Sequence, residues 1–178
     1  RNSGKSSLLN AITGQEIALV SEVKGTTTDP VSKAMEIHPI GPCLLIDTAG
    51  FDDTGDLGNM RIEKTKAVLD KTDVAVVVFS DMQMELETQW IAMLRQRKIP
   101  ILAVVNQVDR IEQVQEIKRQ IEQRFSLTPL LVSAKEKTGI SQMKHEILRL
   151  MPPDFEAQSL TGSLVQPEDV VLLVMPQD

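Results

Sequence analysis

Two patterns of apolar residues, one typical of strands and one of helices, take turns along the chain. Residues 74–79 and 101–105 are apolar at every position, which is typical of strands buried on both faces of a parallel sheet. Residues 111–125 instead repeat apolar residues at helical spacing, with charged residues between them. By these patterns, strands are predicted at residues 31–40, 43–46, 74–79, 101–105, 130–132 and 170–174, and helices at residues 8–13, 61–71, 86–98, 111–125 and 140–150. Such alternation predicts an α/β fold with a doubly wound, mostly parallel sheet, whose ligand lies at the carboxyl ends of its strands.

A phosphate-binding loop is predicted at the start of the chain. The segment Arg1-Asn2-Ser3-Gly4-Lys5-Ser6-Ser7 matches the second half of the motif G-x-x-x-x-G-K-[ST] and opens a helix. The first glycine of that motif, and the first strand of the sheet, are expected to lie ahead of residue 1. Residues 2–7 would bind nucleotide phosphates through backbone N–H groups at the helix N-terminus. Lys5 would contact the β- and γ-phosphates, and the Ser6 hydroxyl would ligate Mg²⁺. For the segment by itself, the alternative is a glycine-capped turn with a solvated lysine.

A second polar motif, Asp47-Thr48-Ala49-Gly50, ends the strand predicted at residues 43–46. An aspartate at this position can hold Mg²⁺ through water, and the Gly50 N–H group can meet the γ-phosphate. The alternative is an ordinary turn begun by an aspartate. Two predicted strands, at residues 31–40 and 43–46, separate Lys5 from this motif. This is the separation that a nucleotide-binding fold needs.

Two further motifs follow the strands predicted at residues 101–105 and 130–132. Asn106-Gln107-Val108-Asp109 resembles the guanine-reading motif Asn-Lys-x-Asp of GTPases, and Ser133-Ala134-Lys135 resembles its companion loop, which contacts the guanine oxygen. The Asp109 carboxylate can accept hydrogen bonds from the N1–H and the exocyclic amine of guanine, which adenine does not offer. Four such loops in this order indicate a site for GTP and GDP.

Over about its first 150 residues the chain therefore resembles the translation-factor-related superfamily of P-loop GTPases, which implies the fold of a G domain and hydrolysis of GTP. Two departures have consequences. Gln107 replaces the lysine of the guanine motif, so we expect weaker stacking on the base and a reduced affinity with unchanged specificity. Phe51 stands where many GTPases place a water-orienting glutamine, so hydrolysis is expected to be slow or assisted.

Asn2 indicates where the assistance could come from. An asparagine two positions before Gly4 resembles the potassium-dependent GTPases, which include tRNA-modification and ribosome-assembly members. By this resemblance Asn2 would help to bind K⁺, Thr27 would ligate Mg²⁺, and the K⁺ site would be completed by the residues Ser21, Val23 and Thr26. The catalytic set implied by the resemblance is Asn2, Lys5, Thr27 and Gly50.

Within that subgroup, residues 25–30 (GTTTDP), the segment Pro39-Ile40-Gly41-Pro42 and the tail at 168–176 resemble the iron-iron hydrogenase maturation GTPases. This resemblance implies a GTP-binding domain at 1–151, a linker at 152–167 and the start of a dimerisation domain at 168–178. It further implies a homodimer, an iron–sulfur cluster in a C-terminal domain outside this chain, and maturation proteins and the hydrogenase as partners. A tRNA-modification or ribosome-assembly GTPase, and a scaffold that binds nucleotide but barely hydrolyses it, remain as alternatives.

Composition and charge indicate the class of protein, its compartment and its partners. The 178 residues are 42% hydrophobic and 25% charged, as is ordinary for one soluble α/β domain. A single cysteine, Cys43, excludes an internal disulfide and suits the cytoplasm. The net charge of -6, without a block of Lys and Arg, makes nucleic acid an unlikely partner of this domain. No apolar run approaches the roughly 20 residues of a membrane span, so no membrane association is expected.

Overall fold

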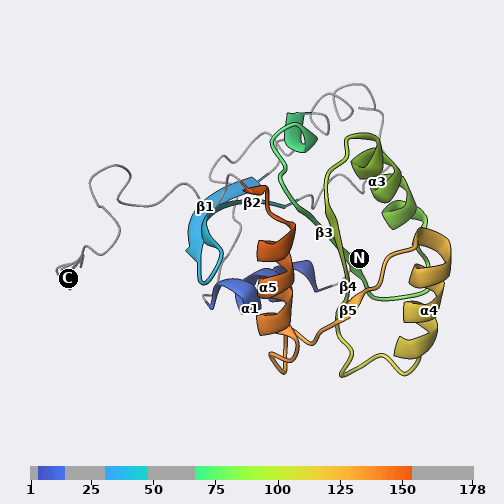
Figure 1. Ribbon diagram of the computed structural model, residues 1–178. Coiled ribbons are helices and arrows are strands. Elements are labelled where there is room, and N and C mark those ends of the chain that lie inside the picture. The colour runs from blue at the N-terminus through green and yellow to red at the C-terminus, as the bar shows by residue number, and fades with distance from the viewer. Residues whose placement is uncertain (1–3, 15–30, 48–66, 154–178) are drawn as a thin grey trace, which may run out of the picture.

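The computed structural model describes residues 4–14, 31–47 and 67–153 (Figure 1). Helices and strands alternate along most of this length, as the apolar patterns predict. In chain order the elements are α1 (Lys5–Thr13), β1 (Val31–Ile37), β2 (Gly41–Asp47), β3 (Ala75–Phe79), α3 (Glu85–Gln96), β4 (Ile101–Val105), α4 (Val114–Phe125), β5 (Leu130–Leu131) and α5 (Ile140–Leu150).

The described strands form a parallel group and an antiparallel hairpin. Strands β3, β4 and β5 are parallel, with β4 in the centre and Val77 opposite Ala103 in the register. Strands β1 and β2 pair antiparallel, with Met35 opposite Cys43. The mostly parallel character follows from the sequence, because runs that are apolar at every position can be buried only between two layers of helices.

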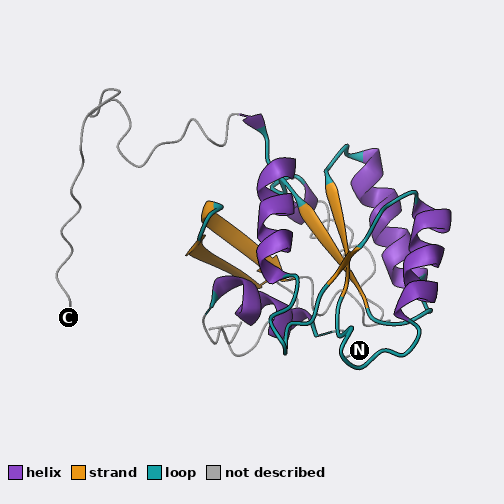
Figure 2. Cartoon of the chain, turned by 60° about the horizontal axis from the view of Figure 1, so that its bottom comes forward, coloured by secondary structure: helices purple, strands orange, loops and turns teal. Residues whose placement is uncertain are grey.

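Two hydrophobic cores lie on opposite faces of the parallel strands. Alternate residues of β4 divide between them: Ala103 and Val105 pack with α3 and α4, whereas Leu102 and Val104 pack with α1 and α5. Figures 1 and 2 show the same arrangement, with α3 and α4 together on one side and α1 and α5 on the other. This confirms the doubly wound α/β fold.

Strands β2 and β3 are not hydrogen-bonded to each other in the part of the chain that the structure describes. Residues of both strands, including Leu45 and Val77, instead line one cavity of about 470 Å³. Residues of α1, α3 and α5 and of the segment 68–74 also line this largely apolar cavity. The first strand expected ahead of residue 1 is not described, and its place in the sheet stays a prediction.

Several element boundaries differ from the sequence predictions. The strand expected at 31–40 ends at Ile37, because residues 38–40 turn the chain into β2. The helix expected at 111–125 begins only at Val114, because the Gln107 carbonyl oxygen accepts N–H bonds from Arg110 and Ile111 and closes a turn there. The helix expected at 86–98 ends at Gln96.

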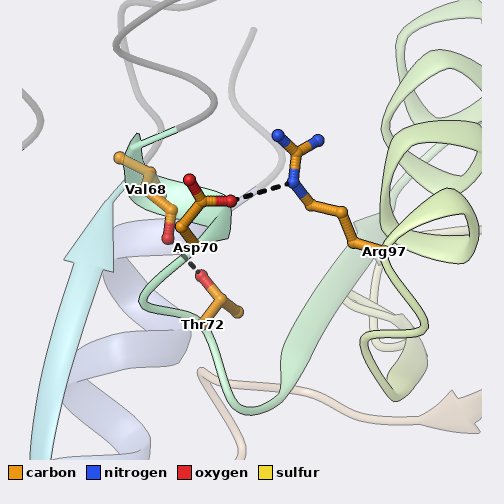
Figure 3. A network of polar contacts seen from close by, with 4 residues as sticks. All are labelled: Val68, Asp70, Thr72 and Arg97. Atoms are coloured by element: carbon orange, nitrogen blue, oxygen red, sulfur yellow. Dashed lines mark hydrogen bonds and ion pairs between the residues drawn. The ribbon is translucent and has the colours of Figure 1, made fainter.

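The helix predicted at 61–71 is described only from residue 67, and residues 67–69 are helical. Its end is closed by the Thr72 hydroxyl, which donates to the Val68 carbonyl oxygen at 2.8 Å. Next to it, the Arg97 Nε donates to the Asp70 carboxylate at 3.2 Å and ties this segment to the end of α3 (Figure 3). Residues 61–66 and the tail strand predicted at 170–174 lie outside the described residues. None of the described helices combines the length and the apolar character needed to cross a membrane.

Candidate nucleotide-binding site

The phosphate-binding segment opens α1, as predicted. Gly4 is the N-cap residue with φ 72° and ψ 24°, a left-handed conformation that glycine adopts without strain. Lys5 begins the helix, and Ser6 and Ser7 in its first turn are exposed to solvent. The first-turn N–H groups of a helix have no intrahelical partner, and the positive end of the helix dipole lies here. The segment therefore has the features that bind phosphate oxygens.

The buried side chain of Asn106 connects three loops at the carboxyl ends of the strands. Asn106 is fully buried. Its Nδ2 donates to the Gly4 carbonyl oxygen at 3.3 Å, and its Oδ1 accepts the Ala134 N–H at 3.2 Å. Its backbone N–H donates to the carbonyl oxygen of Phe79 at 3.0 Å. Since a buried amide is costly unless its polar atoms are paired, these contacts hold the phosphate loop and the two guanine loops in one arrangement.

Gly4 and Asn106 approach each other so closely that only glycine fits at residue 4. A Cβ atom built on Gly4 would lie 2.6 Å from the Asn106 Nδ2 and 3.0 Å from the Gln107 Nε2. The second guanine-motif residue, Gln107, is half-buried and has a left-handed backbone with φ 62°. The sequence placed Gly4 in the phosphate loop, and the structure adds that this glycine is also the contact surface for the guanine motif.

The carboxylate that the sequence predicts to read guanine, that of Asp109, is held by the companion loop. The hydroxyl of Ser133, which is 1% exposed, donates to the Asp109 Oδ1 at 2.6 Å and accepts the Glu136 N–H at 3.1 Å. This hydrogen bond, helped by a backbone hydrogen bond and by the positive charges of Lys135 and Arg110, lowers the pKa of Asp109. Asp109 itself is exposed to solvent. An ionised, oriented carboxylate is the acceptor that the N1–H and amine of guanine require.

The third residue of the companion motif, Lys135, is exposed, and its ammonium lies 3.4 Å from the Glu136 carboxylate. The loop that carries it is closed by two backbone hydrogen bonds between Ser133 and Thr138, of 3.0 and 3.1 Å. Gly139 then starts α5 in a left-handed conformation, and a Cβ on it would lie 2.6 Å from the Leu131 carbonyl oxygen. Sequence reasoning missed Thr138 and Gly139, although a glycine directly before an apolar helix is a signal for such a close turn.

Several predicted site residues lie outside the described part of the chain. Asp47 is the last residue of β2, which places it at the end of that strand, but its side chain is not described. The predicted site residues that lie wholly outside the described ranges are Asn2, Ser3, Ser21, Val23, Thr26, Thr27 and Gly50. The roles assigned to them in binding Mg²⁺, K⁺ and the γ-phosphate stay predictions.

Among the described residues, no three His, Cys, Asp or Glu side chains gather into a metal site. The Mg²⁺ site that the sequence predicts is of another kind, built from hydroxyl and carboxylate oxygens together with phosphates and water. The Ser6 hydroxyl is exposed at the N-terminus of α1 and can serve as such a ligand. A hydroxyl oxygen of this kind suits Mg²⁺, and the roles of Thr27 and Asp47 as its other ligands stay predictions.

Residues 1–107 match the family model described as 50S ribosome-binding GTPase. Together with the doubly wound sheet and the joined phosphate and guanine loops, this match defines the chain as a P-loop GTPase domain, which binds and hydrolyses GTP. The chain belongs to the 50S ribosome-binding GTPase family.

Curated relatives extend the comparison. The chain is 32% identical over 179 residues to tRNA modification GTPase MnmE of Flavobacterium johnsoniae, covering 96% of this chain and 36% of that protein. It is 32% identical over 163 residues to GTPase Der of Wolinella succinogenes, covering 84% of this chain and 34% of that protein. The chain thus spans about a third of the length of the curated relatives it matches.

Solved structures confirm the fold. Era of Aquifex aeolicus bound to GDP and AlF4⁻ superposes with a TM-score of 0.65 at 23% identity, over 85% of this chain and 54% of that chain. A complex of Era with MgGDPNP and a segment of 16S ribosomal RNA gives a TM-score of 0.68 at 24% identity, over 95% of this chain and 57% of that chain. The GTPase assignment is confirmed, whereas the expectation that nucleic acid is an unlikely partner finds no support among these relatives.

Proposed function

We propose that this chain is the nucleotide-driven switch domain of a GTPase whose output is RNA chemistry or RNA binding, in tRNA modification or ribosome assembly. The observation that carries the proposal is the 32% identity to a tRNA modification GTPase over 96% of the chain. GTPase Der and the RNA-bound Era point in the same direction. These relatives favour this function over hydrogenase maturation, which rests on the resemblance of residues 25–30, 39–42 and 168–176 alone.

The geometry of the site is suited to a switch. The Asn106 side chain connects the phosphate loop at Gly4 to the companion loop at Ala134, so base recognition and phosphate binding share one network. A network that both halves of a ligand must satisfy can favour one conformation when the nucleotide is bound. Different RNA affinities of the GTP and GDP states would then follow from different contacts around the γ-phosphate.

Mg²⁺ and K⁺ complete the proposed site. Ser6, Thr27 and Asp47 would hold Mg²⁺, which neutralises charge between the β- and γ-phosphates when it is bound. Asn2, Ser21, Val23 and Thr26 would hold K⁺ beside the phosphates, where the ion would supply the positive charge of an arginine finger. Phe51 would leave the attacking water without the glutamine that orients it in many GTPases. The iron–sulfur cluster of the hydrogenase-maturation alternative would lie in another domain of the natural protein.

The test compares RNA binding in the two nucleotide states. The natural protein that carries this chain is loaded with GDP or with a non-hydrolysable GTP analogue, and its affinity for tRNA and for a 16S ribosomal RNA segment is measured. We expect a nucleotide-dependent difference for one of the two RNAs. As a control, Asp109→Asn should show the difference with a xanthosine triphosphate analogue in place of the GTP analogue, since its base selectivity changes.

The proposal is contradicted by an RNA affinity that is absent, or equal in both nucleotide states, for both RNAs. If the anaerobically prepared protein then also shows the broad visible absorption of an iron–sulfur cluster, hydrogenase maturation is supported instead.

A further inference from the structure

Positively charged side chains gather at the carboxyl ends of helices α3 and α4. Arg95 lies in the last turn of α3 and Arg124 in the last turn of α4. Arg97 and Lys98 directly follow α3, so this stretch of the chain reads Arg-Gln-Arg-Lys. Such a run is too short to stand out in a chain with a net charge of -6, and Arg124 joins it only in the folded protein.

Phe125, the last residue of α4, brings these cations together. The Arg95 Nη2 donates to the Phe125 carbonyl oxygen across the two helices. The Arg124 guanidinium lies 5.5 Å from the centre of the Phe125 ring. Lys98 follows Arg95 by one turn, and its N–H donates to the Arg95 carbonyl oxygen at 3.0 Å. Phe125 is buried and the three cations are exposed, so their charges lie at the surface around one fixed residue.

Part of the positive charge in this region is used within the protein. The Arg97 Nε binds the Asp70 carboxylate at 3.2 Å (Figure 3), which offsets the charge of Arg97. A cation in the last turn also interacts favourably with the negative end of a helix dipole, which is a purely structural role. The bond from Arg95 to Phe125, however, takes one of the five N–H donors of a guanidinium, and the side chain stays exposed. A surplus of positive charge therefore faces solvent.

We propose that Arg95, Lys98 and Arg124 form a docking surface for the phosphate backbone of RNA. Guanidinium and ammonium groups bind phosphate oxygens, and a local positive surface on a domain of negative net charge orients a polyanion toward it. Lys98 lies before the start of β4, whereas Asn106 and the nucleotide loops follow its end. RNA on this surface leaves the nucleotide loops accessible, so the two ligands can bind together. The inference rests on the RNA output proposed above.

Arg124 and Arg149 allow RNA binding to be separated from the structural role. Each is an exposed basic residue in the last turn of its helix, Arg124 in α4 and Arg149 in α5. Helix α5 lies on the other face of the parallel strands (Figure 1). Arg124→Gln and Arg149→Gln remove the same charge from the same position of a helix, so their effects on the helix dipole and on net charge match. Only Arg124→Gln alters the proposed docking surface.

The affinity of the natural protein that carries this chain is measured for tRNA and for a duplex RNA of unrelated sequence, over a range of KCl concentrations. For Arg124→Gln we expect both affinities to fall about two- to fivefold. The slope of log affinity against log salt should become shallower by about one, and by about two for Lys98→Gln/Arg124→Gln. Arg149→Gln should leave affinity and slope unchanged. Thermal unfolding checks that each variant is folded.

The docking surface is overturned if the natural protein binds neither RNA, if the double variant keeps the natural salt slope, or if Arg149→Gln weakens RNA binding as much as Arg124→Gln. Phosphatidylserine vesicles are titrated in parallel. Vesicle binding that the double variant abolishes, without any RNA binding, would also overturn the proposal, because the surface would then face a membrane.

Comparison of the two nucleotide states separates this inference from the proposed function. If the variants lose salt dependence while RNA affinity is equal with GDP and with a GTP analogue, the docking surface stands and the switch function fails. If RNA affinity depends on the nucleotide and the variants leave it unchanged, the switch function stands and the docking surface fails.

Discussion

The Ser133 hydroxyl donates a 2.6 Å hydrogen bond to the Asp109 carboxylate, although the two residues follow different strands of the sheet. Ser133 is buried and Asp109 is exposed, so a buried hydroxyl holds a solvent-exposed acceptor in place. Because Ser133 also accepts the Glu136 N–H, the orientation of its hydroxyl proton toward Asp109 is determined. If Asp109 reads the base as predicted, base recognition depends on two loops acting together.

Asp109→Asn should change the preferred base. The substitution replaces a carboxylate oxygen by an amide that presents a donor to the N1–H of guanine, so a favourable contact becomes an unfavourable one. We expect GTP affinity to fall and the affinity for xanthosine triphosphate to rise, as measured by competition with a fluorescent GDP analogue. An unchanged affinity for GTP would contradict the assignment of Asp109 as the guanine reader.

Ser133→Ala should raise the pKa of Asp109. The hydrogen bond from Ser133 is the largest cause of the lowered pKa, and the positive charge of Lys135 contributes less. A carboxylate with a lowered pKa contributes stability above the ordinary aspartate pKa and loses it as the pH falls through the lowered value. Ser133→Ala moves that loss to higher pH. Carbon-13 NMR titration of the Asp109 carboxyl group measures the shift directly, and Lys135→Ala should give a smaller one.

GTP hydrolysis should be faster in K⁺ than in Na⁺. Asn2 is available for a K⁺ site, and Phe51 cannot orient water as a glutamine would. Steady-state phosphate release by the natural protein in the two salts measures this preference. Asn2→Ala should abolish the preference while GTP affinity stays nearly unchanged. The potassium hypothesis fails if the natural protein hydrolyses GTP equally fast in both salts.

The tail is predicted to join two subunits. Residues 170–174 are five consecutive apolar residues after the polar linker at 152–167, and the helix before that linker, α5, closes the described domain. An apolar strand left without a partner favours pairing with another chain. Light scattering should therefore show a dimer for the natural protein and a monomer for a version that ends at Pro152. If the two proteins have the same oligomeric state, the tail does not join the subunits.

The sequence predicts much of the fold because short runs that are apolar at every position have few alternatives to a buried strand. The run Ile101–Val105 is apolar at all five positions, and the structure buries alternate residues in two separate cores. The turn at residues 108–113 could not be predicted, because it depends on the Gln107 carbonyl and its left-handed backbone rather than on any apolar pattern.

Motifs in the sequence propose which residues form the site, but they do not predict the contacts between those residues. Motifs identify Asn106 and Gly4 as parts of two separate loops, and nothing in their spacing shows that the Asn106 Nδ2 lies 3.3 Å from the Gly4 carbonyl oxygen. That distance arises from the packing of α1 and β4, whose side chains Leu8 and Val104 share one core. Tertiary contacts of this kind are set by the whole fold and have no local signature in the sequence.

Gly4→Ala should disrupt this contact and thereby nucleotide binding. The Cβ atom would lie 2.6 Å from the Asn106 Nδ2, a distance that real Cβ atoms essentially never show, so the two loops must separate. Asn106 would then lose its Gly4 partner while remaining buried. We expect GDP affinity to fall by about tenfold or more, as measured by isothermal titration.

Gly14→Ala is the matched control for this substitution. Gly14 caps the other end of α1 with nearly the same backbone angle, φ 71° against 72° for Gly4, and a Cβ there would meet nothing within 4 Å. Strain in the left-handed region should lower the free energy of unfolding of both variants by about 1–2 kcal/mol. Gly4→Ala should lower it further, because the buried Asn106 also loses its Gly4 partner. Only Gly4→Ala should also weaken GDP binding, because only its Cβ meets the Asn106 amide. Urea unfolding identifies conditions in which both variants are fully folded, and GDP binding is compared there. If Gly14→Ala weakens GDP binding by the same factor as Gly4→Ala, the loss reflects helix stability and not the contact between the two loops.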